Sequence, residues 1–224
     1  MAKTIVIRPS EYWPNLASVA LMQHADIVVL ADTFQYSRQS LQNRMRIRNP
    51  DGWQWVTVPL KGGQHGLPQS HTRIRQVPGW RKRHWKAILF NYSQSAYFDH
   101  YRDSIEEVYH QEWTYLGGLN IAISRLIQQW LGASFTLTAA TEVVGIPCSV
   151  SDILDRYPNA QLLAPEKIPE QHSTHRLYFS HPSYHQAFDG FVSGMTVLDL
   201  ILNYGPESAT LLRKSSRILP THQT

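Results

Sequence analysis

Two short apolar stretches near the N-terminus, Thr4–Arg8 (TIVIR) and Ile27–Leu30 (IVVL), decide the fold of this chain. Both are rich in β-branched residues, which favour strands. The stretch between them, Tyr12–His24, has apolar residues at helical spacing and predicts a helix. A strand, a helix and a second strand within about 30 residues are typical of a parallel βαβ unit, in which the helix crosses one face of the sheet. The fold class is therefore predicted to be α/β.

The remaining elements are predicted from the same patterns. Alternating or β-branched residues indicate strands at Trp53–Leu60, Thr72–Val77 and Phe135–Thr138. Helical patterns indicate helices at Trp80–Tyr92, Tyr97–Glu112, Leu116–Leu131, Ser151–Arg156 and Phe191–Asn203, the last of which is stopped at Gly205-Pro206. Residues 158–175 are rich in Pro, Gln and His and are predicted to form a surface loop. We expect one domain over residues 1–224, with a basic, ligand-binding α/β part (1–78) and a mostly helical part (79–224) packed on it.

The composition excludes several classes of protein. Hydrophobic residues make up 42% of the chain, which is ample for a buried core. The single cysteine, Cys148, excludes an intramolecular disulfide and fits a reducing compartment. No stretch approaches the roughly 20 apolar residues that span a bilayer, and the N-terminus lacks the apolar core of a signal peptide. We therefore expect a cytoplasmic protein without a membrane span.

Positive charge is concentrated between residues 33 and 98. This segment holds eleven of the 21 Lys and Arg residues, but Asp51 is its only member of the 17 Asp and Glu residues. Clustered like charges repel one another, so an anion is the expected ligand. The candidates are a phosphorylated small molecule, an anionic glycan donor and nucleic acid.

The densest cluster of side-chain donors is Ser37–Arg48 (SRQSLQNRMRIR). If Ser40–Arg48 is helical, Arg44 and Arg48 share one face of the helix. Guanidinium groups bind phosphate or carboxylate oxygens through two parallel hydrogen bonds. A merely solvent-exposed helix would be expected to carry acidic partners at four-residue spacing, and this stretch has none. The pattern therefore predicts an anion-binding pocket.

A nucleic-acid site is the alternative for the basic segment. Trp80–Lys86 (WRKRHWK) interleaves cations and indoles, as single-strand readers do. Trp80 and Trp85 lie on different faces of a helix, however, and at least one is expected in the core. Lys61-Gly62-Gly63 could offer backbone N–H groups to a phosphate or form a plain loop, and no Walker or G-x-G-x-x-G motif is present. The sequence thus favours a small anionic ligand over nucleic acid.

A metal site is not expected. His181 and His185 have metal-ligand spacing if the segment is helical, and Asp189 continues the row. Pro182 lies between them and no H-E-x-x-H motif is present, which favours a structural or substrate-contacting role.

Segments along nearly the whole chain resemble the WbqC-like protein family. They are Ile7–Pro14 (IRPSEYWP), Ala25–Asp32 (ADIVVLAD), Phe34–Ser40 (FQYSRQS), Gln42–Arg44 (QNR), Gly52–Pro59 (GWQWVTVP), Tyr184–Gln186 (YHQ) and the closing Phe191–Gly205. Two departures stand out. In the opening motif, Arg8 replaces the usual His or Gln and Asn15-Leu16-Ala17 lacks the family's glycine; further on, the region before Leu177 is shortened, and the family's usual passage is not recognisable around Leu162–Glu170.

The resemblance implies an enzyme of surface-polysaccharide biosynthesis. It points to a transferase that modifies an amino sugar with an acyl or aminoacyl group, or that uses a phosphorylated, nucleotide-linked donor; nucleotide and acyl-CoA both remain open as cofactors. A more distant similarity to nucleotidylyltransferase-like domains favours a Rossmann-like sheet, although their H-x-G-H signature is missing. The alternative is a non-catalytic module that binds nucleic acid or a glycan-assembly partner.

The predicted site combines strand ends with the donor-rich segment. Arg8 ends the first predicted strand and Asp32 lies just beyond the second. Both are predicted to be catalytic, Arg8 by stabilising negative charge and Asp32 by orienting a hydroxyl or amine or acting as a base. The predicted substrate-binding residues are Gln35, Arg38, Gln42, Asn43, Arg44, Arg46, Lys61, Tyr184 and His185. We expect one pocket to be lined by Arg8, Asp32, Gln35, Arg38, Asn43 and Arg44.

Overall fold

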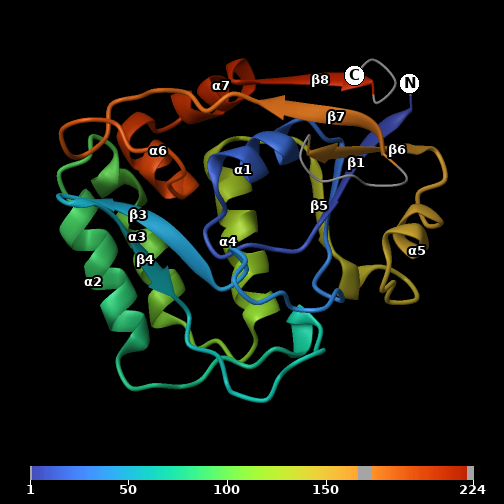
Figure 1. The fold of residues 1–224 in the computed structure, drawn as a ribbon, viewed down its shortest axis with the longest axis horizontal. Helices are drawn as coiled ribbons and strands as arrows, with labels where there is room; N and C mark the ends of the chain where they lie inside the picture. Colours follow the sequence, from blue (N-terminus) through green and yellow to red (C-terminus); the bar gives the residue numbers. More distant parts are fainter. Residues whose placement is uncertain (1, 166–172, 221–224) are drawn as a thin grey trace.

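The βαβ unit is present in the computed structural model, which describes residues 2–165 and 173–220 (Figure 1). Strands β1 (Lys3–Arg8) and β2 (Ile27–Leu30) pair in parallel, with Ile5 opposite Ile27. Helix α1 (Leu16–Gln23) connects them. It begins after Asn15, whose side-chain oxygen accepts the Ser18 N–H at 2.8 Å and so satisfies one free donor of the first turn.

The two strands are neighbours in a six-stranded sheet with the order β5-β2-β1-β6-β7-β8. Strand β5 (Thr136–Ala139) extends the sheet beyond β2, while β6 (Ala160–Pro165) and β7 (Ser173–Phe179) extend it in parallel beyond β1. Strand β8 (Ser216–Pro220) closes the far edge antiparallel to β7. The predicted mixed α/β class is thus confirmed, with a mostly parallel central sheet.

The surface loop predicted for residues 158–175 is wrong where the structure describes it, because β6 and the start of β7 lie there. Leu162 and Leu163 of β6 are buried in the sheet, and pairing with β1 and β7 outweighs the Pro- and Gln-rich composition. Residues 166–172 of the predicted loop lie outside the described residues.

Three helices pack beside the sheet and agree closely with the prediction. They are α2 (Trp80–Tyr92), α3 (Phe98–His110) and α4 (Leu116–Trp130). Trp80 and Trp85 of α2 are both buried, which confirms that at least one of them belongs to the core. Figure 1 shows α2 and α3 on the side of the molecule away from α5 (Val150–Leu154), the short helix predicted at Ser151–Arg156, and α4 in the middle of the view.

The C-terminal part differs in detail from the prediction. Helix α6 (Val197–Tyr204) begins six residues later than expected, because Thr196 takes the N-cap position. Gly205 ends it with a φ of 53°, which favours glycine. A further helix, α7 (Glu207–Lys214), and strand β8 follow Pro206 and were not predicted.

The predicted helix at Ser40–Arg48 is wrong. Its second half is strand β3 (Arg44–Asn49), which pairs antiparallel with β4 (Gly52–Thr57) in a separate hairpin. Buried Met45 and Ile47 alternate with the arginines, so the hairpin turns its apolar face to the core.

The strand predicted at Thr72–Val77 is also absent. Only isolated bridges form there, from Ile74 to Leu60 and from Arg73 to Tyr115. The short 3-10 helices Gln69–His71 and Ala140–Glu142 complete the elements in the described part. No helix among the described residues has the length and apolar character needed to cross a bilayer.

Candidate anion-binding site

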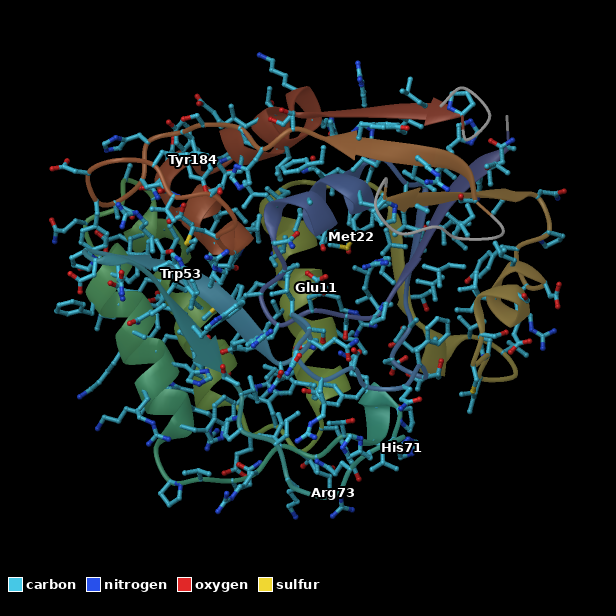
Figure 2. The ribbon with its side chains drawn as sticks, viewed as in Figure 1. Glu11, Met22, Trp53, His71, Arg73 and Tyr184 are labelled. Carbon is cyan, nitrogen blue, oxygen red and sulfur yellow. The ribbon has the colours of Figure 1, made fainter. Side chains whose placement is uncertain are left out.

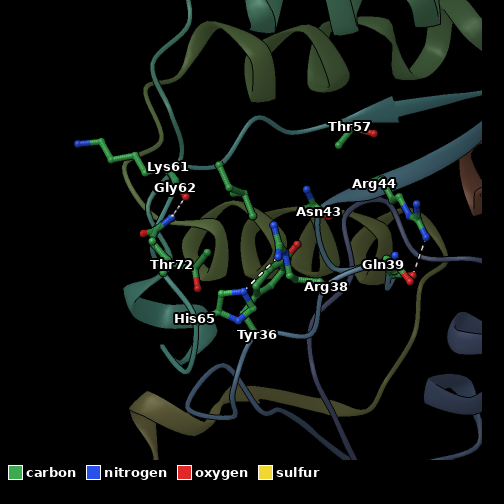
Figure 3. Close-up of a pocket in the computed structure, with 13 residues that line it drawn as sticks. Tyr36, Arg38, Gln39, Asn43, Arg44, Thr57, Lys61, Gly62, His65 and Thr72 are labelled. Atoms are coloured by element: carbon green, nitrogen blue, oxygen red, sulfur yellow. Dashed lines mark hydrogen bonds between the residues drawn. The ribbon is translucent and has the colours of Figure 1, made fainter.

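A cleft of about 630 Å³ opens beside the hairpin, between the loop that follows β2 and the loop that follows β4 (Figure 3). In the close-up, Arg44 and Lys61 lie on opposite sides, and Arg38 and His65 meet between them. The lining residues are Tyr36, Arg38, Gln39, Asn43, Arg44, Thr57, Leu60, Lys61, Gly62, Gly63, Gln64, His65 and Thr72.

The lining contains three permanent cations and no acidic side chain. In the described part of the chain, no ion pair joins Arg38, Arg44 or Lys61 to a carboxylate. Arg38 donates a hydrogen bond to Nε2 of His65 at 3.1 Å, and Arg44 donates to the backbone oxygen of Gln39 at 2.5 Å. The contacts place the guanidinium groups but leave their charge uncompensated, as an anion site requires.

The pKa of Tyr36 reflects the electrostatic environment of the cleft. Burial raises the pKa of its phenol, while the charges of Arg38 and Arg44 act in the opposite direction. Both arginines therefore act on the same ring, and the cleft combines partial burial with positive potential. A bound anion in such a place interacts more strongly than it would in open water.

Hydrogen bonds hold the walls of the cleft. Asn43 donates to the backbone oxygen of Val58 at 3.1 Å, which joins the start of β3 to the end of β4. Gln64 donates to the backbone oxygen of Lys61 at 2.8 Å and accepts the N–H of Arg73 at 2.6 Å. These contacts fix the Lys61-Gly62-Gly63 turn, in which Gly63 has a φ of 71°.

The structure brings four of the predicted site residues into the cleft: Arg38, Asn43, Arg44 and Lys61. Arg8, Asp32, Gln35, Gln42, Arg46, Tyr184 and His185 are not among its lining residues. Of the six residues expected in one pocket, three are therefore together. The loop after β2 lies at the carboxyl end of a parallel strand, where the site was predicted, and it lines the cleft. The prediction from strand ends did not include the β3–β4 hairpin and the loop after β4, which form the rest of the cleft.

Asp32 is buried and holds two strands together. One carboxylate oxygen accepts the N–H of Thr141 at 3.0 Å, and the other accepts the Thr141 hydroxyl at 2.7 Å. The residue thereby links the end of β2 to the turn after β5. Both of its oxygens are occupied by these structural contacts.

Arg8 lies half-buried at the end of β1, close to Glu11. Burial raises the pKa of the Glu11 carboxyl, against the Ser18 hydrogen bond (2.9 Å) and the charge of Arg8. Figure 2 shows Glu11 near the middle of the molecule, beside α1.

Two of the predicted glutamines lie near the cleft without lining it. Gln35 is exposed and its backbone bridges to Pro68. Gln42 is buried, and its side-chain oxygen accepts the Ser37 N–H at 3.3 Å. Gln42 therefore orders the chain that carries Arg38.

Tyr184 belongs to a buried polar network instead of the cleft. Its hydroxyl donates to Asp199 at 2.7 Å, and Gln186 donates to the same oxygen at 2.8 Å. Burial raises the pKa of Asp199 in spite of these hydrogen bonds. His185 is exposed and donates its backbone N–H to the Tyr204 hydroxyl at 3.0 Å.

The histidines of this segment lie in irregular chain. Residues 181–189 are not helical, so His181 and His185 lack the spacing that a helix would give them. Nε2 of His181 accepts the N–H of Gly194 at 3.0 Å. Among the described residues, no group of three His, Cys, Asp or Glu side chains is arranged to hold a metal ion.

Several cleft residues were not predicted. Tyr36, Gln39, His65 and Thr72 line it beside the arginines. Tyr36 and Gln39 flank Arg38 in sequence, and His65 follows the glycine turn, so proximity to the basic residues was the available signal. Thr72 gave no such signal, because only folding of the loop brings it to the cleft.

The comparisons with known proteins agree with the resemblance seen in the sequence. A model of the WbqC-like protein family matches residues 10–211. The chain is also 29% identical over 232 residues to "Uncharacterized protein Rv1507c" of Mycobacterium tuberculosis (strain ATCC 25618 / H37Rv), covering 94% of this chain and 98% of that protein. No solved structure matches the chain. Because the family model spans most of its length, this chain belongs to the WbqC-like protein family.

Proposed function

We propose that this protein is a transferase of surface-polysaccharide biosynthesis and that the cleft binds its phosphorylated donor. The observation that carries the proposal is a cleft lined by Arg38, Arg44 and Lys61 without an acidic side chain. Membership of the WbqC-like family supports the setting, through the polysaccharide role that the sequence resemblance implies.

The cleft residues suit phosphoryl or acyl transfer chemically. Arginine and lysine stabilise negative charge that develops on transferred or leaving oxygens. His65 and Tyr36 supply groups that can accept or donate a proton beside them. The Gly62-Gly63 turn, exposed and held from both ends, offers backbone N–H groups to a phosphate. The donor is a nucleotide sugar or a related diphosphate, with acyl-CoA as the second candidate.

A nucleic-acid ligand fits less well. On α2 the cations Lys82, Arg83 and Lys86 are exposed, but both indoles, Trp80 and Trp85, are buried. The helix therefore presents charge without the stacking faces that single-strand readers use. Steeply salt-dependent binding of an oligonucleotide, tighter than binding of any nucleotide sugar, would overturn the proposal in favour of this alternative.

The experiment is a binding screen followed by one pair of variants. Thermal shift and calorimetry are measured with nucleotide sugars, the corresponding nucleotides and acyl-CoA. Arg44→Ala is expected to weaken binding of the best ligand about ten- to a hundredfold, because a charge-assisted contact is lost. Lys86→Ala removes an equal, exposed charge outside the cleft and is expected to bind as the parent does.

The outcomes separate cleanly. Equal losses in Arg44→Ala and Lys86→Ala would show that overall charge, and not the cleft, binds the ligand. Absence of binding to every phosphorylated compound would contradict the proposal as a whole.

A further inference from the structure

We propose that the outer face of the β3–β4 hairpin is the second half of this binding site. In it, Trp53 and Trp55 hold Arg46 and Arg44 so that Arg46 binds a second anionic group of the ligand whose first group lies in the cleft. The inference rests on the proposed function of the cleft and names its substrate class as a diphosphate.

The strand register builds this face. Side chains two residues apart on a strand share a face, so Arg44 and Arg46 point the same way. On the paired strand, Trp55 lies opposite Arg46, and Trp53 lies opposite Arg48. Trp53 and Trp55 are each 40% exposed, although tryptophan is usually well buried. Figure 2 places Trp53 on the hairpin, with Tyr184 on the segment above it.

The indoles contact both arginines. The guanidinium carbon of Arg46 lies 3.7 Å from the centre of the Trp53 ring and 5.7 Å from that of Trp55. The guanidinium carbon of Arg44 lies 4.3 Å from the Trp55 centre. The two indoles meet edge to face at 5.5 Å. Both cations therefore approach one Trp55 ring, within reach of a single small ligand.

An aromatic partner holds a cation without neutralising it. A carboxylate in the same place would cancel the charge, whereas the ring attracts the guanidinium through its quadrupole alone. No carboxylate of the described chain pairs with Arg44 or Arg46. Nε of each arginine is buried without a hydrogen-bond acceptor there, a feature that Arg48 shares, so the indole contacts and the missing carboxylates carry the inference. Burial also lowers the pKa of Arg46, so a bound anion would relieve an uncompensated charge.

Arg44 connects the two halves. It lines the cleft and also lies over Trp55, while Arg46 lies one step further along the strand and outside the cleft. Alternate residues of a strand are about 7 Å apart, and guanidinium groups flex beyond that. A ligand with two adjacent phosphates can therefore contact both, whereas a single phosphate uses the cleft alone.

Gly194 keeps the Arg46 end open. A Cβ at this position would lie 3.1 Å from Nη1 of Arg46, and the φ of Gly194 is 78°. The adjoining segment is anchored to the strand, because Thr196 donates its N–H to the backbone oxygen of Arg46 at 2.8 Å. A side chain at position 194 would thus press on the guanidinium.

The test compares inorganic pyrophosphate with inorganic phosphate by calorimetry on the full chain. Arg46→Ala and Trp53→Leu are each expected to weaken pyrophosphate binding about tenfold, since one charge-assisted contact is lost or misplaced. Phosphate binding is expected to change less than twofold in both. Trp53→Phe keeps an aromatic face and is expected to restore most of the pyrophosphate affinity.

A glycine pair provides a control for folding effects. Gly194→Ala and Gly190→Ala both place alanine at a left-handed φ (78° and 75°), but a Cβ at Gly190 meets nothing within 4 Å. Only Gly194→Ala is expected to weaken pyrophosphate binding. Equal losses in the two glycine variants, or unchanged pyrophosphate affinity in Arg46→Ala and Trp53→Leu, would refute the second subsite. If Arg44→Ala still weakens anion binding in that case, the cleft remains supported as a binding site and only the second subsite is refuted. A parent protein that binds neither anion would refute both.

Discussion

Arg46 and Arg48 point to the same side of strand β3, yet they differ in exposure and in their hydrogen-bond partners. Arg46 is partly exposed and lies over Trp53, with no carboxylate or backbone acceptor among the described residues. Arg48 is 3% exposed and donates to the backbone oxygens of Asn49, Gly52 (2.8 Å) and Asp189 (2.6 Å). Nε of both arginines is buried without an acceptor among the described residues, so the difference lies in the Nη groups. An arginine whose Nη groups donate to backbone oxygens ties loops together, whereas one whose Nη groups lack such partners is available to a ligand.

The cleft and the buried polar network around Asp199 differ in the same way. Around Asp199, the polar groups of Tyr184 and Gln186 converge on one carboxylate oxygen inside the core. In the cleft, Arg38 and Lys61 have no such counterpart. The difference indicates that a charged side chain does not identify a binding site by its charge alone. What matters is whether hydrogen-bond partners within the protein already satisfy the side chain. Three predictions test this division, in order of expected effect.

The largest effect is expected for Leu198→Ala in α6. Leu198 is fully buried, and truncating such a side chain costs about 2–5 kcal/mol of unfolding free energy. Urea denaturation measures this loss. Arg44→Ala, on the ligand side of the division, is expected to stay within about 0.5 kcal/mol of the parent. A collapse of stability in Arg44→Ala would mean that the basic cleft is a structural network.

A second effect depends on pH and on the buried His84. Burial lowers the pKa of His84 to about 4, even though Nε2 contacts the backbone oxygen of Thr57 at 3.1 Å. The unfolded chain binds this proton near pH 6.5, so the stabilisation is complete above that pH. It is lost as the pH falls from about 6.5 to about 4, by about 3 kcal/mol in total.

The measurement for His84 is urea denaturation at pH 7, 5.5 and 4 for the parent and His84→Gln. The parent is expected to lose more stability than the variant over this range. Because Asp199, Glu11 and other groups titrate in both proteins, only the difference between the two counts. Parallel losses would show that His84 is not held neutral by the fold.

The smallest of the three concerns Arg48. Arg48→Ala leaves the backbone oxygens of Gly52 and Asp189 without this donor, and we expect a loss of about 1–3 kcal/mol of unfolding free energy. Affinity for pyrophosphate is expected to change less than threefold. An affinity loss as large as that of Arg46→Ala, at unchanged stability, would erase the distinction between the two arginines.

Part of the fold could be predicted because local pattern and tertiary context agree. Strand β1, helix α1 and strand β2 have strong local signals, and α2 was predicted with its observed bounds, Trp80–Tyr92. Strand β3 was missed although Arg44–Arg48 (RMRIR) alternates polar and apolar residues with a period of two, which indicates a strand. The four-residue spacing of Arg44 and Arg48 also fits one face of a helix, so the segment is compatible with both patterns.

For the site, the sequence by itself determined which charges are available. The cluster of Arg and Lys residues without acidic partners predicts an anion site, and four of the predicted binding residues, Arg38, Asn43, Arg44 and Lys61, line one cleft. Charge and donor type are properties of each residue, so they can be read without coordinates.

Only the tertiary structure decided which of the candidate polar groups are free. Asp32 was an equally reasonable candidate in sequence, but Thr141, more than a hundred residues away, occupies both of its oxygens. Arg48 and Arg46 differ for the same reason, since a backbone oxygen at Asp189 reaches one and Gly194 leaves the other open. Whether a polar group has a hydrogen-bond partner depends on contacts with residues far away in the sequence, and no local sequence pattern predicts these contacts.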